Sequence, residues 1–142
     1  MKVVFVRHGE SEANVADFIN DNPKRIVNLT MRGREQAEEA AARLRSLPFS
    51  HAFASEFPRA RQTAEIILQH HPSELRVDAR LNERKSGMDG LPTCTFNDLV
   101  FPDPINIRPP LGETFLEQTE RLRSFLESLQ FCLLYTSDAA DE

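Results

Sequence analysis

The stretch that decides the fold covers residues 3–11 and reads Val3-Val4-Phe5-Val6-Arg7-His8-Gly9-Glu10-Ser11. Its four leading apolar residues, most of them β-branched, predict a short buried strand. A cation, an imidazole and a glycine follow directly, at the strand end where open α/β sheets place their ligand sites. Residues 11–19 predict a short helix whose free N–H groups favour an anion. The stretch therefore predicts a phosphate-binding strand end.

Length and composition favour one soluble globular domain. The chain has 142 residues, of which 40% are apolar and 27% charged, enough to bury a sizeable core. Its net charge of −5 argues against nonspecific nucleic-acid binding. No apolar run approaches the length of a membrane span or of a signal peptide, so we expect a cytoplasmic protein without a membrane partner. The two cysteines, Cys94 and Cys132, have neither metal-site spacing nor the number that a disulfide framework needs.

Strands and helices are predicted to alternate along the rest of the chain, which indicates a layered α/β domain. Short strands are expected at 51–54 and 75–77, and helices at 31–46 and 59–69. Thr30 is a good N-cap for the helix at 31–46, whose narrow apolar face is formed by Ala37, Ala40, Ala41 and Leu44. Gly33 costs helix stability in the first turn, which predicts that close packing requires it.

The last third of the chain contains one long segment without a clear period. Residues 91–112 hold five prolines and are predicted to be an irregular excursion that could cover a site as a lid. A helix follows, with Thr114 and Glu117 forming a capping box and with Glu117 and Arg121 spaced to pair at i, i+4.

Four stretches in this order match the motifs of a known family. They are Arg7-His8-Gly9-Glu10-Ser11 with Asn14; Leu29-Thr30 with Gly33, Gln36 and Ala37; Ser55 with Arg59-Ala60 and Gln62-Thr63-Ala64-Glu65; and Leu81-Asn82-Glu83-Arg84 with Gly87 and Gly90. A weaker fifth is Gly112-Glu113. Together they resemble the histidine phosphatase superfamily, which implies an α/β fold, a three-layer phosphoglycerate-mutase-like sandwich.

The resemblance implies a role for each matching residue. His8 is then the nucleophile that accepts the phosphoryl group, and Glu83 is the general acid and base. Arg7, Asn14 and Arg59 match the phosphate-binding positions, where fixed cations and amide donors stabilise the charge on the transferring oxygens. Two arginines supply that field without a metal, so no metal or other cofactor is implied. The implied substrate is a small phosphorylated metabolite.

Three of these residues also have a simpler interpretation. In isolation, Arg59 reads as an exposed helix charge, Glu83 as a solvated loop carboxylate and Asn14 as a local capping residue. Phosphomonoester hydrolysis is favoured over a phosphoglycerate mutase, because the stretch 15–28 lacks the Thr-Gly-Trp-like segment of the mutases. A non-catalytic phosphate-binding module is a third alternative, and it is the state expected of the chain if it is a truncated fragment. The individual metabolite and the oligomeric state are left open.

The C-terminus departs from the family pattern. The family has a second essential histidine after a further buried strand, and this chain does not reach it. Residues 132–142 resemble a translated sequencing-library adapter, so we expect residues 1–131 to be the N-terminal part of one domain and the tail to be non-native. The alternative is a genuine short strand at 133–136. A sheet incomplete at its C-terminus would expose an unpaired edge and an apolar helix face, which predicts poor stability and impaired catalysis.

Overall fold

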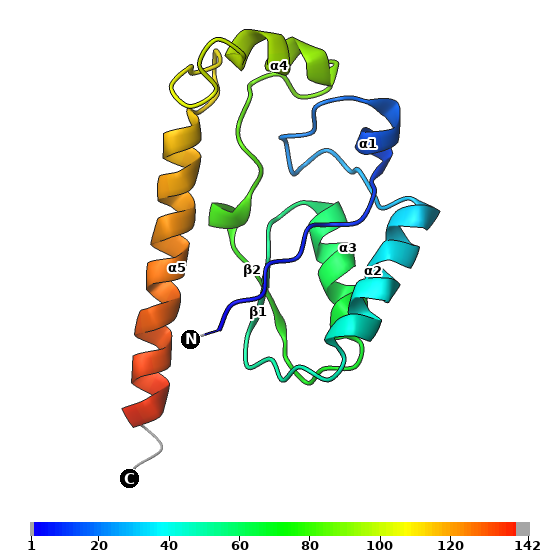
Figure 1. The fold of residues 1–142 in the computed structure, drawn as a ribbon, viewed down its shortest axis with the longest axis vertical. Helices are drawn as coiled ribbons and strands as arrows, with labels where there is room; N and C mark the ends of the chain where they lie inside the picture. The colour runs from blue at the N-terminus through cyan, green and yellow to red at the C-terminus, as the bar shows by residue number, and fades with distance from the viewer. Residues whose placement is uncertain (1, 139–142) are drawn as a thin grey trace.

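The computed structural model describes residues 2–138 and has α-helices around a small parallel sheet (Figure 1). In chain order the elements are α1 (Glu12–Ala16), α2 (Met31–Leu44), β1 (Ala52–Ala54), α3 (Pro58–Leu68), β2 (Leu75–Val77), the 3-10 helix η1 (Ala79–Leu81), α4 (Thr93–Val100) and α5 (Phe115–Asp138). No helix in the described part of the chain is both long and apolar enough to cross a bilayer.

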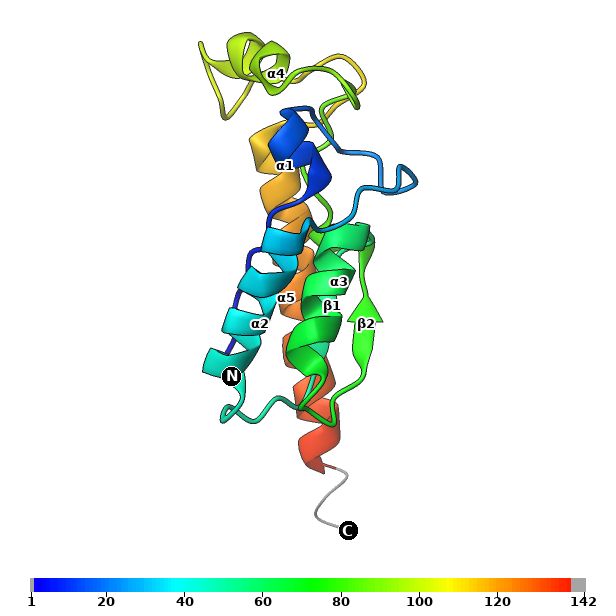
Figure 2. The same ribbon diagram turned by 90° about the vertical axis from the view of Figure 1, so that its right-hand side faces the viewer.

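The sheet lies between two helical layers. β1 and β2 pair in parallel, with Ala52 opposite Leu75 and Ala54 opposite Val77. Helices α2 and α3 lie on one side of the strands and α5 lies on the other (Figures 1 and 2). This is the three-layer arrangement that the family resemblance implies. The parallel strands β1 and β2 are joined by a crossover helix, α3, as a parallel connection requires.

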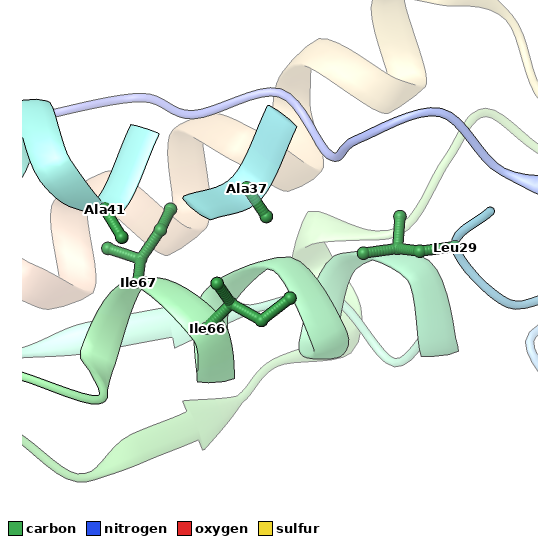
Figure 3. Close-up of a cluster of buried hydrophobic side chains, with 5 residues drawn as sticks. All are labelled: Leu29, Ala37, Ala41, Ile66 and Ile67. Atoms are coloured by element: carbon green, nitrogen blue, oxygen red, sulfur yellow. The ribbon is translucent and has the colours of Figure 1, made fainter. Parts of the chain in front are cut away.

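The core between α2 and α3 is built on small side chains. Ala37 and Ala41 of α2 face Ile66 and Ile67 of α3, and Leu29 closes one end of the cluster (Figure 3). The alanines let the two helices approach closely, while the isoleucines supply most of the buried apolar surface. The predicted face of α2 is thus confirmed, and so is its cap, because the Thr30 hydroxyl accepts the N–H of Gly33.

The N-terminal segment differs from its prediction. Val3 and Val4 are each 40% exposed and Phe5 is 70% exposed, and no strand is assigned over residues 2–10. Within the described residues β1 pairs only with β2, so the N-terminal segment has no strand beside it. That segment, β1 and α5 line an apolar cavity of about 940 Å³. The prediction of a buried first strand is therefore wrong. The apolar cavity lies within the layer of the sheet.

Three other segments also differ from prediction. The first helix is shorter than residues 11–19, because Asp17 adopts a left-handed conformation that ends α1. The excursion at 91–112 contains a regular helix, α4. The strand alternative at 133–136 is wrong, since α5 continues to Asp138. Of the tail predicted to be non-native, residues 139–142 lie outside the described residues, as do the side chains of the tail's other residues.

Side-chain pairing at the start of α5 is partly as predicted. The capping box is confirmed, because the Glu117 N–H donates to the Thr114 hydroxyl at 3.2 Å and the Thr114 N–H donates to the Glu117 carboxylate at 2.8 Å. The i, i+4 pair of Glu117 and Arg121 is wrong. Glu117 pairs with Arg108 and Arg121 pairs with Glu113, because both partners reach α5 from the loop that precedes it.

Candidate active site

Two glycines fix the end of the N-terminal segment against α2. A Cβ on Gly9 would lie 2.2 Å from the Gly33 carbonyl oxygen, and a Cβ on Gly33 would lie 2.0 Å from the Glu10 carbonyl oxygen. The Gly9 N–H also donates to the Thr63 hydroxyl of α3 at 3.1 Å. Backbone therefore packs directly on backbone here, which explains why a glycine occupies the first turn of α2. This contact sets the position of His8.

The His8 imidazole is half-buried and held through both ring nitrogens. Its Nδ1 lies 2.7 Å from the Gly9 carbonyl oxygen, which can only accept, so Nδ1 carries the proton in the neutral ring. Its Nε2 then accepts the Nε–H of Arg59 at 3.2 Å. Burial lowers the pKa of His8, and the charges of Arg59 and Arg7 lower it further. The site thus favours a neutral imidazole whose unprotonated Nε2, the nitrogen that can act as a nucleophile, lies against the Arg59 guanidinium.

Arg59 is buried in the first turn of α3 and is fixed on several sides. Its guanidinium lies 4.3 Å from the centre of the Phe57 ring. The two terminal nitrogens donate to Asn20, one to the side-chain oxygen and the other to the backbone oxygen. Together with the bond to His8, these contacts engage three of the five N–H groups of an arginine, which leaves two for an anion. The alternative of an exposed helix charge is wrong for Arg59, which is 6% exposed.

Asp89 fixes the loop that carries Asn20. Its carboxylate accepts the Asn20 side-chain amide at 3.3 Å and the Asp21 N–H at 3.0 Å, and it pairs with Arg25 at 2.5 Å. Burial acts to raise the pKa of Asp89, but the hydrogen bonds from Arg25, Asn22 and Asn20 outweigh it and lower the pKa. The sequence analysis missed both Asn20 and Asp89. They lie 69 residues apart, and no local pattern connects them.

Arg7 and Asn14 line a cavity of about 430 Å³ together with His8. Both side chains are exposed. The Asn14 side-chain oxygen accepts the backbone N–H and the hydroxyl of Ser11, each at 2.9 Å. The capping interpretation of Asn14 is therefore confirmed, and its amide nitrogen is the end that can donate to an anion. Arg7 and His8 line the larger apolar cavity as well, so both cavities border the end of the N-terminal segment.

Glu83 follows η1 and is exposed to solvent. Its carboxylate accepts the N–H of Arg84 at 3.0 Å, and its charge acts to raise the pKa of His8, which places it within electrostatic reach of the imidazole. The side chain of the neighbouring Asn82 accepts the backbone N–H of Glu56, which follows β1, and donates to the Glu56 carboxylate. The structure therefore brings His8 and Arg59 into contact and Arg7 and Asn14 alongside them, while Glu83 approaches from another loop.

The described residues contain no cluster of three histidine, cysteine, aspartate or glutamate side chains that could hold a metal ion. The charged groups around His8 are instead the two arginines and Glu83. A pocket of this kind, with a neutral nucleophile beside fixed cations, suits a phosphoryl group.

Comparisons with known proteins agree with this geometry. The sequence profile of the histidine phosphatase superfamily (branch 1) matches residues 3–132. The chain is 34% identical over 141 residues to the "Probable phosphoglycerate mutase GpmB" of Escherichia fergusonii, a match that covers 90% of this chain and 62% of the relative. The protein of the same name from Escherichia coli O1:K1 / APEC is 32% identical with the same coverage. The chain thus spans 62% of the length of these curated relatives.

Solved structures give the same fold. The alpha-ribazole phosphatase from Shigella flexneri matches with a TM-score of 0.79 and 26% identity, over 90% of this chain and 66% of that protein. The mycobacterial glucosyl-3-phosphoglycerate phosphatase, solved as a complex with VO3, matches with a TM-score of 0.77 and 26% identity, over 88% of this chain and 62% of that protein. The fold is therefore similar to that of proteins named as phosphatases.

Proposed function

This chain belongs to the histidine phosphatase superfamily, and we propose that its activity is phosphomonoester hydrolysis through a phosphohistidine on His8, with Glu83 as the general acid and base. The observation that carries the proposal is the state of the His8 ring. Its Nδ1 proton is tied to the Gly9 carbonyl, and its Nε2 lone pair faces the Arg59 guanidinium. An imidazole held this way presents one unprotonated nitrogen beside a fixed cation that an incoming phosphate also needs.

The reaction proceeds in two steps. In the first, Nε2 attacks phosphorus, the ester P–O bond breaks, and the leaving alkoxide takes the proton of the Glu83 carboxyl group. In the second, the Glu83 carboxylate takes a proton from a water whose oxygen attacks the phosphorus, and the P–N bond breaks to return the electron pair to Nε2. Inorganic phosphate leaves, and Glu83 is again protonated.

The phosphoryl oxygens bind where Arg7, Asn14 and Arg59 converge on His8. Arg59 is buried against the His8 ring, and the exposed Arg7 and Asn14 line the cavity beside that ring. In the transition state the charge is spread over the three equatorial phosphoryl oxygens, so positioning and fixed positive charge dominate catalysis. Small phosphorylated metabolites of the cytoplasm are the proposed substrates.

A phosphoglycerate mutase is the second candidate function. It is favoured by the name of the curated relatives, which are 32–34% identical to this chain. Hydrolysis is supported by the names of two structural neighbours, both phosphatases, and by a stretch at 15–28 without the Thr-Gly-Trp-like segment. The two functions share the phosphohistidine and differ in which acceptor takes the phosphoryl group next.

The test is to trap the phosphoryl group. The purified chain is incubated with a phosphomonoester, quenched in alkaline detergent and analysed for alkali-stable phosphate on His8, with His8→Ala as the control. A label on His8 with steady phosphate release supports the phosphatase. A label that persists until a phosphoglycerate is added supports the mutase. A folded protein that takes no label but binds orthovanadate would be a phosphate-binding module, and the catalytic proposal would fall.

The acid role of Glu83 is tested through the leaving group. Glu83→Gln should slow phosphoryl transfer from an alkyl phosphate by roughly 100-fold or more, the usual contribution of a general acid. Transfer from p-nitrophenyl phosphate should change far less, because its phenolate leaves without a proton. Equal losses with both substrates would show that Glu83 does not donate the proton.

A further inference from the structure

The segment that carries Glu83 is attached to the first turns of α5. η1 packs against α5 (Figure 1), and residues 82–85 continue from it without regular secondary structure. Backbone groups in such a segment have no helix or ladder partners, so their positions depend on side chains. Two residues of the α5 region provide these partners, namely Glu113 and Arg121.

Arg121 binds three backbone carbonyls around Glu83. One terminal nitrogen donates to the carbonyl oxygens of Arg80 at 2.9 Å and Asn82 at 3.2 Å. The other donates to Asn82 at 3.2 Å and to Glu83 itself at 3.5 Å. The planar fork of a guanidinium can hold several acceptors in one fixed geometry, which an ammonium group cannot. The carbonyls before and at Glu83 are thus held by one side chain.

Glu113 fixes the orientation of that fork. Its carboxylate accepts the Nε–H of Arg121 at 3.1 Å and a terminal N–H at 2.5 Å, which makes a bidentate pair. The same carboxylate accepts the backbone N–H of Lys85 at 3.0 Å, and the Glu113 N–H donates to the Lys85 carbonyl at 2.9 Å. Both ends of the segment 82–85 are therefore attached to Glu113 or Arg121. The pair is largely shielded, with side-chain exposures of 11% and 23%.

The Glu83 side chain has much weaker support of its own. It is exposed, and its carboxylate accepts a hydrogen bond from the backbone N–H of the next residue, Arg84. Its position therefore depends mainly on its backbone. We propose that Arg121, oriented by Glu113, is a positioning residue that directs the Glu83 carboxyl group toward His8. This inference rests on the proposed function, in which Glu83 is the proton donor.

The test measures the electrostatic coupling of Glu83 to His8, which needs no turnover. The His8 ring is titrated by NMR in the whole chain, with His51, His70 and His71 as internal references. Glu83→Gln should shift the His8 titration to lower pH, because it removes a negative charge that raises the pKa of His8. Arg121→Lys keeps the charge and loses the fork, so it should shift His8 in the same direction. In the Glu83→Gln background, Arg121→Lys should have no further effect.

Two comparisons make the result specific. Arg123→Lys is the matched control, since Arg123 lies on the same helix in an exposed pair with Glu120, and it should leave His8 unchanged. Glu113→Gln is the second variant if Arg121→Lys does not fold, and it should give a smaller downward shift. Unchanged references confirm that the fold is intact.

The contrary outcomes are distinct. If Glu83→Gln shifts His8 but neither Arg121→Lys nor Glu113→Gln does, the positioning inference is overturned and the acid role stands. A shift by Arg121→Lys that persists in the Glu83→Gln background also overturns it, since the arginine would then act on His8 by another route. If Glu83→Gln itself has no effect, Glu83 does not face His8, and both the acid role and the inference fall.

Discussion

The site around His8 and the region around the N-terminal segment of the chain differ in their packing. The polar side chains of the site are hydrogen-bonded to one another, whereas the apolar side chains of the N-terminal segment are largely uncovered. Around His8, the side chains of Arg59, Asn20 and Asp89 form one continuous set of hydrogen bonds. Around the N-terminal segment, Phe5 is 70% exposed and an apolar cavity of about 940 Å³ separates the helical layers. The polar site is thus built from loops and helix ends, and it does not depend on strand pairing beside residues 2–6. Site geometry and sheet stability should respond separately to mutation.

The largest effect is expected where the two regions meet, at the glycine contact. Gly33→Ala should unfold the chain or destabilise it by about 3 kcal/mol or more, because its Cβ would lie 2.0 Å from a backbone oxygen. Helix propensity alone predicts the opposite sign, a gain of about 1 kcal/mol. Ala42→Gly, at an exposed position of the same helix, is the matched control and should cost about 1 kcal/mol. Chemical denaturation measures both, and a stabilised Gly33→Ala would refute the close contact.

A smaller effect is expected from the open apolar layer. The chain should self-associate as its concentration rises, because an unpaired edge of β1 and the apolar walls of the cavity are exposed together. Phe5→Asp should weaken that association roughly tenfold or more, since burying a phenylalanine contributes about 2 kcal/mol. Phe101→Asp changes a residue that is 82% exposed and lies outside the cavity, so it should have no effect. Sedimentation velocity over a range of concentrations measures this association. A chain that stays monomeric at every concentration would contradict the prediction.

The polar site gives the next effect. Asp89→Asn should weaken orthovanadate binding about tenfold, because an amide loses the pair with Arg25 and holds Asn20 and hence Arg59 less firmly. Asp98→Asn, at an exposed position of α4, is the control. Calorimetric titration measures the dissociation constants. Equal affinities in the two variants would mean that Arg59 keeps its position without the loop network.

The same contrast explains what the sequence could predict. Local signals gave correct results: Thr30 caps α2, Thr114 and Glu117 form the capping box, and Gly33 is required by packing. Each depends on residues a few positions apart or on the size of one side chain. Pairing across the chain was not predictable in this way. The buried strand at 3–6 was wrong because burial needs a neighbouring strand, which no local pattern supplies.

Polar contacts between residues far apart in the chain could not be predicted from the sequence either. Asn20 belongs to none of the motifs in the sequence, yet it holds Arg59, which is 39 residues away. The family resemblance located His8 and Arg59, which the structure places in contact, but it carried no information about the residues that hold them. Arg121 was paired with Glu117 by helical spacing, whereas Glu113 competes successfully by presenting both carboxylate oxygens.

The smallest effect is a pH dependence of stability from Glu113. Burial acts to raise its pKa, but the hydrogen bonds from Arg121 and Lys85 outweigh it and hold the pKa below the ordinary 4.5. A carboxyl group whose pKa is lower in the folded chain contributes stability that is fully present above the unfolded pKa and is lost as the pH falls through the folded pKa. Glu113→Gln should therefore lower stability near neutral pH and flatten its decline below about pH 4.5. Glu127→Gln, at an exposed position of α5, should keep the decline. Denaturation series at several pH values measure both slopes, and parallel slopes for Glu113→Gln and the unmodified chain would show that the ion pair with Arg121 does not stabilise the fold.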